Sequence, residues 1–308
     1  MDMKENVTIS VSQKILEVIK AYYKPYFVTA SGEYVDFQAN INGIVVTGYS
    51  SRKENKKVTF QGENALREAQ IWNPEAKVNE KKEIVSEGWL CFEDQIGSDE
   101  VGVGDFLGPM IVVAAYVNKK DIKKLQAYGI HDSKKMTDIR IMEIGPKIVK
   151  EFKFSKLTLQ NEKYNEVLDK GENLNSMKAK MHNRALLNMH KEHPEVTNIF
   201  VDEFVNEKKY YKYLNDEKEE QVTGIVFKTK GESYFPCVAL ASVIARYSYL
   251  REMEKLGDKY KMAFPFGAGK KVNAFATKFV KKYGEKEFYK IVKKNFANYS
   301  EVLNNKLI

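Results

Sequence analysis

The sequence predicts a chain of two domains, a small α+β unit followed by a larger mixed α/β unit. Two observations indicate this fold class. Residues 1–75 show the pattern strand, helix, three strands and helix, and from residue 88 onward apolar strands alternate with amphipathic helices. A polar segment rich in Lys and Glu, residues 76–87, is typical of a linker. We therefore expect an N-terminal domain at 1–75 and a second domain at 88–308.

The first domain begins with an alternating strand at residues 7–11, and apolar residues then recur at helical spacing over residues 15–22. Three strand-like runs at 34–41, 43–49 and 57–61 and a helix at 63–72 complete it. The dipeptide Asn42-Gly43 indicates a tight hairpin between the first two of these runs. This order predicts an antiparallel sheet backed by helices.

The second domain mixes the two types of element throughout. We expect strands at 90–100, 110–117, 154–160, 196–201 and 221–228, and helices at 138–151, 174–191 and 237–250. Basic helices are expected to follow at the C-terminus. Strands interspersed with helices in this way predict a mixed α/β sandwich.

Composition excludes several classes of protein. No run of about 18 apolar residues occurs, so we expect no membrane span and no membrane partner. The N-terminus leads into no apolar signal core, and two cysteines, Cys91 and Cys237, are too few for a disulfide scaffold. These features predict a cytoplasmic protein. We further expect a monomer with no obligate protein partner.

The net charge of +8 is concentrated at one end of the chain. Residues 1–87 are balanced, whereas residues 251–308 hold 14 basic and 6 acidic side chains. A basic segment with aromatic residues among its lysines can neutralise phosphates and stack on bases, which suggests a polyanionic partner. The alternative interpretation is a solvated helix face with ordinary core aromatics.

Acidic residues stand at the ends of three apolar strands. Asp99 and Glu100 interrupt the first strand, Asp202 directly follows another, and Glu232 lies between a strand and the helix that begins near Pro236. Neighbouring side chains of a strand point to opposite faces, so Asp99 and Glu100 cannot both be solvated if their strand is central. A buried carboxylate needs a cation, a metal ion or hydrogen-bond donors.

Adjacent strands of one sheet would bring these four carboxylates into one pocket, where they repel one another unless cations are present. Ligand sets made only of oxygen indicate Mg²⁺ or Mn²⁺ rather than zinc. Two such ions facing a phosphodiester allow its hydrolysis. Two alternatives stay open here. Asp99 and Glu100 can belong to a solvated turn at a sheet edge, and Glu232 can favour the dipole of the following helix.

Four short motifs carry a resemblance to a known family. They are Gly97–Gly102 with its continuation Gly104–Pro109, the segment Asp132–Asp138, the pair Val201-Asp202, and Glu232 with the helix Ala239–Arg246. At these residues the chain resembles the type 2 ribonuclease H family, and most closely its bacterial ribonuclease HIII group. The resemblance covers residues 88–308 and implies a ribonuclease H-like mixed sheet flanked by helices. The unit at 1–75 looks like the small TATA-box-binding-protein-like domain that precedes it in this group.

The resemblance implies that the chain is an endoribonuclease. It would hydrolyse the RNA strand of RNA–DNA hybrids and leave 5′-phosphate and 3′-hydroxyl ends. Asp99, Glu100, Asp202 and Glu232 would be its catalytic, metal-binding acids, with two Mg²⁺ or Mn²⁺ ions in the reacting complex. One alternative is incision at single embedded ribonucleotides, as in ribonuclease HII. The other is a hybrid-binding module without catalysis.

The resemblance also implies substrate contacts. The backbone amides of Gly102, Val103 and Gly104 would contact the 2′-hydroxyl that marks the RNA strand, because glycine permits close approach. Ser133 and Lys134 would bind phosphate. The chain has Val103 where relatives usually carry Lys or Arg, so only the backbone role carries over and the N-terminal domain would bear more of the binding. At the fourth acid, it has Glu where many relatives carry Asp.

Overall fold

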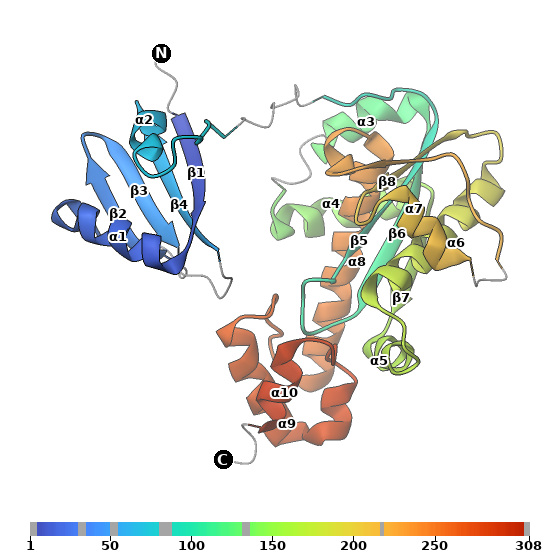
Figure 1. Cartoon of the computed structure of the whole chain (residues 1–308). Coiled ribbons are helices and arrows are strands. Elements are labelled where there is room, and N and C mark those ends of the chain that lie inside the picture. The colour runs from blue at the N-terminus through green and yellow to red at the C-terminus, as the bar shows by residue number, and fades with distance from the viewer. Residues whose placement is uncertain are drawn as a thin grey trace. The chain divides into compact units, whose positions relative to one another are not determined.

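The computed structural model in Figure 1 describes residues 5–29, 35–49, 55–79, 88–130, 136–215 and 219–304. The chain divides into two compact units, Met1–Ser86 and Glu87–Ile308. Ser133 and Lys134, the predicted phosphate contacts, lie outside the described residues. Within the ranges that are described, no helix is both long and apolar enough to cross a membrane.

The N-terminal unit is a four-stranded antiparallel sheet with the strand order β1-β4-β3-β2. Its elements are β1 (Glu5–Val11), α1 (Gln13–Tyr23), η1 (Lys24–Tyr26), β2 (Val35–Ile41), β3 (Ile44–Tyr49), β4 (Lys56–Gly62) and α2 (Ala65–Gln70). Asn42 and Gly43 form the turn between β2 and β3 with φ angles of 49° and 83°, as a two-residue hairpin requires. The predicted order of elements is confirmed.

Alternation along the strands gives this sheet one apolar and one polar face. Val7, Ile9 and Phe60 on the apolar face pack into one core with Leu16 of α1 and Ala69 of α2. Both helices therefore lie on that face. On the opposite face, four polar side chains form a row across the sheet, because their residues are paired in register: Thr8, Thr59, Thr47 and Gln38.

The second unit contains a five-stranded mixed sheet with the order β7-β6-β5-β8-β9. Its first elements are β5 (Gln95–Val101), β6 (Met110–Val117), α3 (Ile122–Ala127), α4 (Asp138–Glu151), β7 (Phe154–Leu159) and α5 (Asn161–Asp169). They are followed by α6 (Leu174–Glu192), β8 (Asn198–Asp202), α7 (Glu207–Leu214), β9 (Ile225–Lys228), η4 (Gly231–Ser233), α8 (Pro236–Tyr260), α9 (Lys270–Tyr289) and α10 (Ala297–Asn304). β5, β8 and β9 are parallel, whereas β6 is antiparallel to both of its neighbours. The strand that carries Asp99 and Glu100 is therefore central.

Two long helices cover the two faces of this sheet, α8 on one and α6 on the other (Figure 1). Successive residues of β6 show the division, since Val113 packs into the core that contains α8 and Val112 into the core that contains α6. The same alternation in β5 places Ile96 on the α6 side. Ser98 and Glu100 share that side, and Asp99 faces α8.

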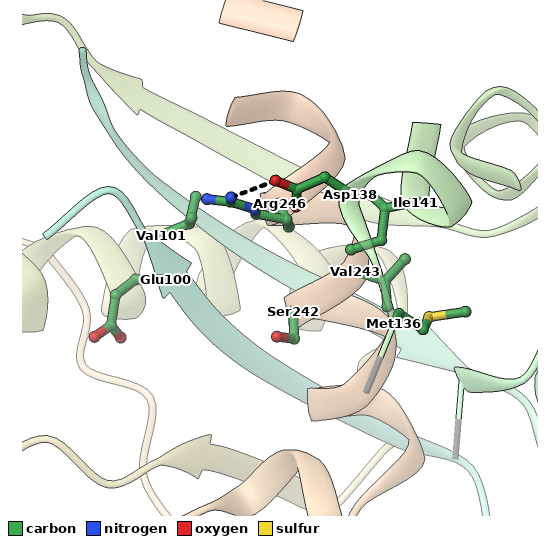
Figure 2. A pocket seen from close by; sticks show the side chains of 8 residues that line it. All are labelled: Glu100, Val101, Met136, Asp138, Ile141, Ser242, Val243 and Arg246. Atoms are coloured by element: carbon green, nitrogen blue, oxygen red, sulfur yellow. Dashed lines mark hydrogen bonds and ion pairs between the residues drawn. The ribbon is translucent and has the colours of Figure 1, made fainter. Parts of the chain in front are cut away.

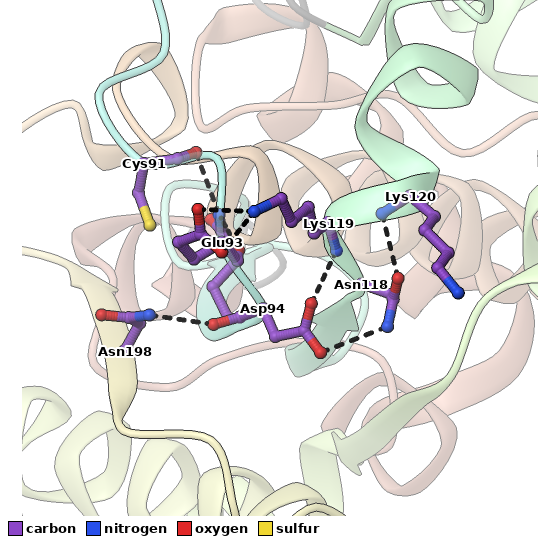
Figure 3. A network of polar contacts seen from close by, with 8 residues as sticks. Cys91, Glu93, Asp94, Asn118, Lys119, Lys120 and Asn198 are labelled. Atoms are coloured by element: carbon purple, nitrogen blue, oxygen red, sulfur yellow. Dashed lines mark hydrogen bonds and ion pairs between the residues drawn. The ribbon is translucent and has the colours of Figure 1, made fainter.

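Several boundaries differ from the predictions. Helices α3, α5 and α7 were not predicted, and α8 runs ten residues past 250 because Met253 and Tyr260 continue its buried face. β5 begins at Gln95 rather than residue 90. The carboxylate of Asp94, just before β5, accepts hydrogen bonds from the Tyr116 hydroxyl at 2.9 Å and from the Lys119 amide at 2.8 Å. Figure 3 shows the bond from Lys119. Residues 90–94 therefore lie outside the strand.

Candidate active site

The predicted acids meet at one edge of the five-stranded sheet. Because β5, β8 and β9 are parallel, their carboxyl ends lie together. Ser98 pairs with Val201, so Asp99 and Asp202 are the next residues of two adjacent strands. The Gly231 amide donates to Asp202 Oδ1 at 2.8 Å, which brings the η4 turn and its buried Glu232 to the same edge.

Asp99 is buried on the α8 side, with 8% of its surface exposed. It accepts hydrogen bonds from the Glu100 amide at 2.7 Å and from Ser242 of α8. Burial, together with the negative charges of Glu100 and Asp202, raises the pKa of Asp99 to about 8. The interpretation of this carboxylate as part of a solvated edge turn is therefore wrong. The two charged groups that raise the pKa of Asp99, namely Glu100 and Asp202, are both negative.

Glu100 points to the opposite side, toward α6. Its Oε1 forms an ion pair with Lys178, and its Oε2 lies 3.0 Å from His182 Nε2. Burial opposes ionisation of Glu100, but His182 and Lys178 outweigh it and hold the pKa of Glu100 below its usual value. The other ring nitrogen of His182 lies 2.7 Å from Ser98 Oγ. Ser98 and Glu100, which lie on the same face of β5, thus both contact α6.

Lys178 and His182 are one helical turn apart on α6 and are almost completely buried. The aromatic ring of Phe204 lies beside both, 4.0 Å from Lys178 Nζ and stacked on the His182 ring at 5.2 Å. Sequence reasoning did not identify these two residues. The available signal was a lysine and a histidine at i and i+4 on the helix side that otherwise carries Met177 and Met181.

The predicted substrate turn divides into residues with different roles. Gly102 has a φ angle of 84°, and a Cβ there would collide with the Pro109 carbonyl and the Tyr249 ring. Internal packing therefore requires glycine at position 102. Val103 packs into an apolar cluster that includes Met177. Gly104 is exposed, and a Cβ there would have no neighbour within 4 Å.

A cavity of about 180 Å³ opens beside Glu100, between the end of β5, the start of α4 and α8. Figure 2 shows the Arg246 guanidinium and Asp138 paired on its wall and the Ser242 hydroxyl on the α8 side. Arg246 makes two hydrogen bonds of 2.8 Å to Asp138 and lies 4.9 Å above the Phe266 ring. The cavity thus has a fixed basic group on its wall.

The donor set fits hard divalent cations, because it consists of carboxylate oxygens; burial, and then the charges of Glu100 and Asp202, raise the pKa of Asp99 among them. In the described parts of the chain, no three side chains of His, Cys, Asp or Glu are grouped closely enough to hold an ion as they stand. Glu100 is directed at Lys178 and His182. Its carboxylate has to turn to share an ion with Asp99.

Two further alternatives from the sequence concern Glu232 and the C-terminal aromatic residues. Glu232 lies in η4, before α8, and the first turn of α8 itself contains no acid. The aromatic residues of the basic C-terminal segment belong to or pack against the main core, which favours the interpretation of ordinary core aromatics: Tyr260, Tyr283, Phe288, Phe296 and Tyr299.

Comparison with known proteins identifies the family. A family model described as Ribonuclease HII matches residues 96–299, and one described as a domain of unknown function, DUF3378, matches residues 6–84. Ribonuclease HIII of Bacillus mycoides is 37% identical over 308 residues, which cover 96% of this chain and 97% of that protein. The chain belongs to the ribonuclease HIII family. Ribonuclease HIII of Bacillus cereus is also 37% identical, over 98% of this chain and 99% of its own length.

Solved structures of ribonuclease HIII support the same assignment. The crystal structure of Bst-RNase HIII in complex with Mn²⁺ is 32% identical, covers 98% of this chain and 99% of its own, and has a TM-score of 0.68. Aquifex aeolicus RNase H3, at 21% identity and a TM-score of 0.53, supports the fold alone. The predicted ribonuclease H-like sheet preceded by a small domain is confirmed.

Proposed function

We propose that the chain hydrolyses the RNA strand of RNA–DNA hybrids with divalent ions held by Asp99, Glu100, Asp202 and Glu232, leaving 5′-phosphate and 3′-hydroxyl ends. As a member of the ribonuclease HIII family, it is an endoribonuclease of the ribonuclease H type. The observation that carries the site assignment is geometric: Asp99 and Asp202 follow the paired residues Ser98 and Val201 of adjacent parallel strands, the Gly231 amide next to Glu232 bonds Asp202, and burial together with the charges of Glu100 and Asp202 raises the pKa of Asp99. Carboxylates that repel one another in this way are suited to bind cations.

Mg²⁺ and Mn²⁺ are the ions that suit these ligands, and Bst-RNase HIII has been crystallised with Mn²⁺. Two such ions, when bound, supply an activated water and stabilise the leaving oxygen. The chain prepares the ligands through separate contacts. The Gly231 amide orients Asp202 and the Ser242 hydroxyl orients Asp99, whereas Lys178 and His182 of α6 keep the buried Glu100 ionised.

The substrate contacts start at the turn that follows β5. Gly104 offers an exposed amide where a ribose can approach closely, and we assign the 2′-hydroxyl contact to the turn Gly102–Gly104. Ser133 and Lys134 remain the proposed phosphate contacts. Arg246 lines the same cavity as Glu100, where it is paired with Asp138.

We assign the N-terminal domain, residues 1–75, to substrate binding. Its polar sheet face presents hydroxyl and amide groups in one row, with Gln38 Nε2 donating to Thr47 Oγ1 at 3.2 Å. Such groups bond to sugar and phosphate oxygens without reading sequence. A flat, hydrogen-bonding surface of this kind fits the backbone of a duplex.

We also propose that the protein acts in the cytoplasm as a monomer. Cys91 and Cys237 are free, which suits a reducing compartment. All four acids come from one chain, so one copy suffices for the site. Sedimentation equilibrium of the full chain at micromolar concentration tests the oligomeric state, and a stable dimer would contradict the proposal.

The test of the metal-binding site compares Asp202→Asn with Glu203→Gln. Glu203 is the adjacent acid, and it accepts a hydrogen bond from Thr229 Oγ1 at 3.0 Å away from the other acids. With a labelled RNA strand in a hybrid and Mg²⁺ or Mn²⁺, we expect cleavage by the wild type and by Glu203→Gln. We expect a loss of about a hundredfold or more for Asp202→Asn. Wild-type cleavage by Asp202→Asn would remove it from the site.

The substrate is tested separately. A hybrid with a continuous RNA tract is compared with duplex DNA that contains one ribonucleotide. Val103 is partly buried against an apolar cluster and supplies no basic side chain, so we expect the continuous tract to be preferred. Preference for the single ribonucleotide would favour the ribonuclease HII-like alternative.

A further inference from the structure

Lys293 is a completely buried lysine outside the set of acids. Its Nζ donates to the carbonyl oxygens of Asp105 at 2.9 Å and Gly108 at 2.5 Å. Burial lowers the pKa of Lys293 to about 7, and the charge of Asp105 partly opposes this effect. Burying an ammonium group costs free energy, so its two acceptors in one short loop require an explanation.

The backbone around Lys293 fixes this geometry. The Lys293 amide donates to the Phe106 carbonyl at 2.9 Å, and the Gly108 amide donates to the Ile291 carbonyl at the same distance. Leu107 and Val292 form an antiparallel bridge between these bonds. The segment just after α9 therefore lies alongside the loop of residues 105–108, which follows the substrate turn. The Lys293 side chain reaches two carbonyls of that loop.

Two contacts connect the acceptors of Lys293 to the turn Gly102–Gly104. The Asp105 amide donates to the Gly102 carbonyl at 3.3 Å, while the Asp105 carbonyl accepts from Lys293. Gly108, the second acceptor, precedes Pro109, whose carbonyl packs against Gly102. The Lys293 ammonium is thus connected to the Gly102–Gly104 turn by two routes, one through Asp105 and one through Gly108 and Pro109.

We propose that Lys293 is a positioning residue that keeps the Gly102–Gly104 turn in place to contact the ribose 2′-hydroxyl. The inference rests on the proposed function, because the turn has this role only if the substrate is an RNA–DNA hybrid. Lysine suits the position, since an ammonium has several donors and reaches two carbonyls at once. Asn161 assists it, with Nδ2 donating to the Gly108 carbonyl at 2.9 Å.

The experiment uses the full chain and the variant Lys293→Met, which keeps the length and removes the donors. The control is Lys294→Met, because Lys294 pairs with Asp169 and makes no contact with the loop. We measure kcat and KM for a hybrid and the inhibition constant of duplex DNA of the same sequence. For Lys293→Met we expect KM for the hybrid to rise about tenfold while the DNA constant stays within about twofold. Lys294→Met should match the wild type.

A general loss of structure would weaken hybrid and DNA alike, and that result would overturn the inference, as would an unchanged KM. If Lys293→Met does not fold, Asn161→Ala tests the inference instead. We then expect KM for the hybrid to rise about threefold while the inhibition constant of duplex DNA stays unchanged. No hybrid-specific change in Asn161→Ala would also overturn it. A wild type that cuts no hybrid contradicts the proposed function itself, whereas a wild type that cuts and a Lys293→Met that equals it contradict only the role of Lys293.

Discussion

The Oε2 atom of Glu100 lies 3.0 Å from Nε2 of His182, a residue with no exposed surface on α6. The opposite nitrogen of the same ring lies 2.7 Å from Ser98, two residues earlier on β5. The direction of this carboxylate is therefore set by a helix, whereas that of Asp99 is set by α8 on the other face. Asp99 and Glu100 are thus adjacent in the chain but are held by helices on opposite faces of the sheet.

Replacement of Lys178 by Met should lower hybrid cleavage by about tenfold, because Glu100 loses one of the two groups that keep it ionised in its buried position. The pKa of Glu100 should also rise, since burial then outweighs the remaining stabilisation. The acidic limb of kcat/KM against pH is expected to move to higher pH. Lys180→Met is the control, because Lys180 pairs with Glu172. An unmoved acidic limb in Lys178→Met would contradict this role.

Replacement of Asp99 by Asn should stabilise the protein at alkaline pH when no divalent ion is present. The pKa of Asp99 is raised from 3.8 to about 8 in the folded protein, so the folded state keeps a proton that the unfolded chain has lost over this window. The free energy of unfolding therefore falls as pH rises from about 4 to 8. Calorimetry should show that the Tm advantage of Asp99→Asn grows from near zero at pH 4 to about 4 °C or more at pH 8.5. A constant difference would be inconsistent with the raised pKa.

Divalent ions should stabilise the wild type through the same acids. Millimolar Mn²⁺ at pH 8 is expected to raise Tm by a few degrees, since ligands that bind only the folded state stabilise it. Asp202→Asn should lose most of this shift, and Glu203→Gln should keep it. Differential scanning fluorimetry measures all three proteins. An equal shift in Asp202→Asn would place the ions elsewhere.

The polar face of the N-terminal sheet should affect binding more than chemistry. Thr59→Val with Gln61→Ala removes two hydrogen-bonding groups that lie on the same face of β4. We expect KM for the hybrid to rise about fivefold with kcat unchanged. Lys14→Gln on α1, which lies on the other face, is the control. An unchanged KM in the double variant would mean that this face does not bind the hybrid.

Local patterns explain which features the sequence predicted. The hairpin at Asn42-Gly43 and the strand that ends at Asp202 depend on residues that are neighbours in the chain. The meeting of the acids at one edge followed from a general property of parallel strands. For the hairpin and the strand end, nearby residues were sufficient evidence.

Contacts between distant segments explain what was missed. Lys293 lies in a run of lysines typical of a solvated surface, and its burial depends on carbonyls almost 190 residues away in the chain. Lys178 is likewise buried in a position where Glu100, on β5, forms an ion pair with it. Gly102 resembled a substrate contact, whereas the carbonyl of Pro109 determines its need for glycine. In each case, the contact that explains the residue cannot be inferred from its type and its immediate neighbours in the sequence.

The most direct measurement is anomalous diffraction from Mn²⁺ in crystals of the full chain with an RNA–DNA hybrid whose scissile linkage resists hydrolysis. We predict manganese peaks in contact with the carboxylates of Asp99, Glu100, Asp202 and Glu232, next to the RNA strand. Manganese bound to the hybrid at other residues, with no peak at these four, would contradict it.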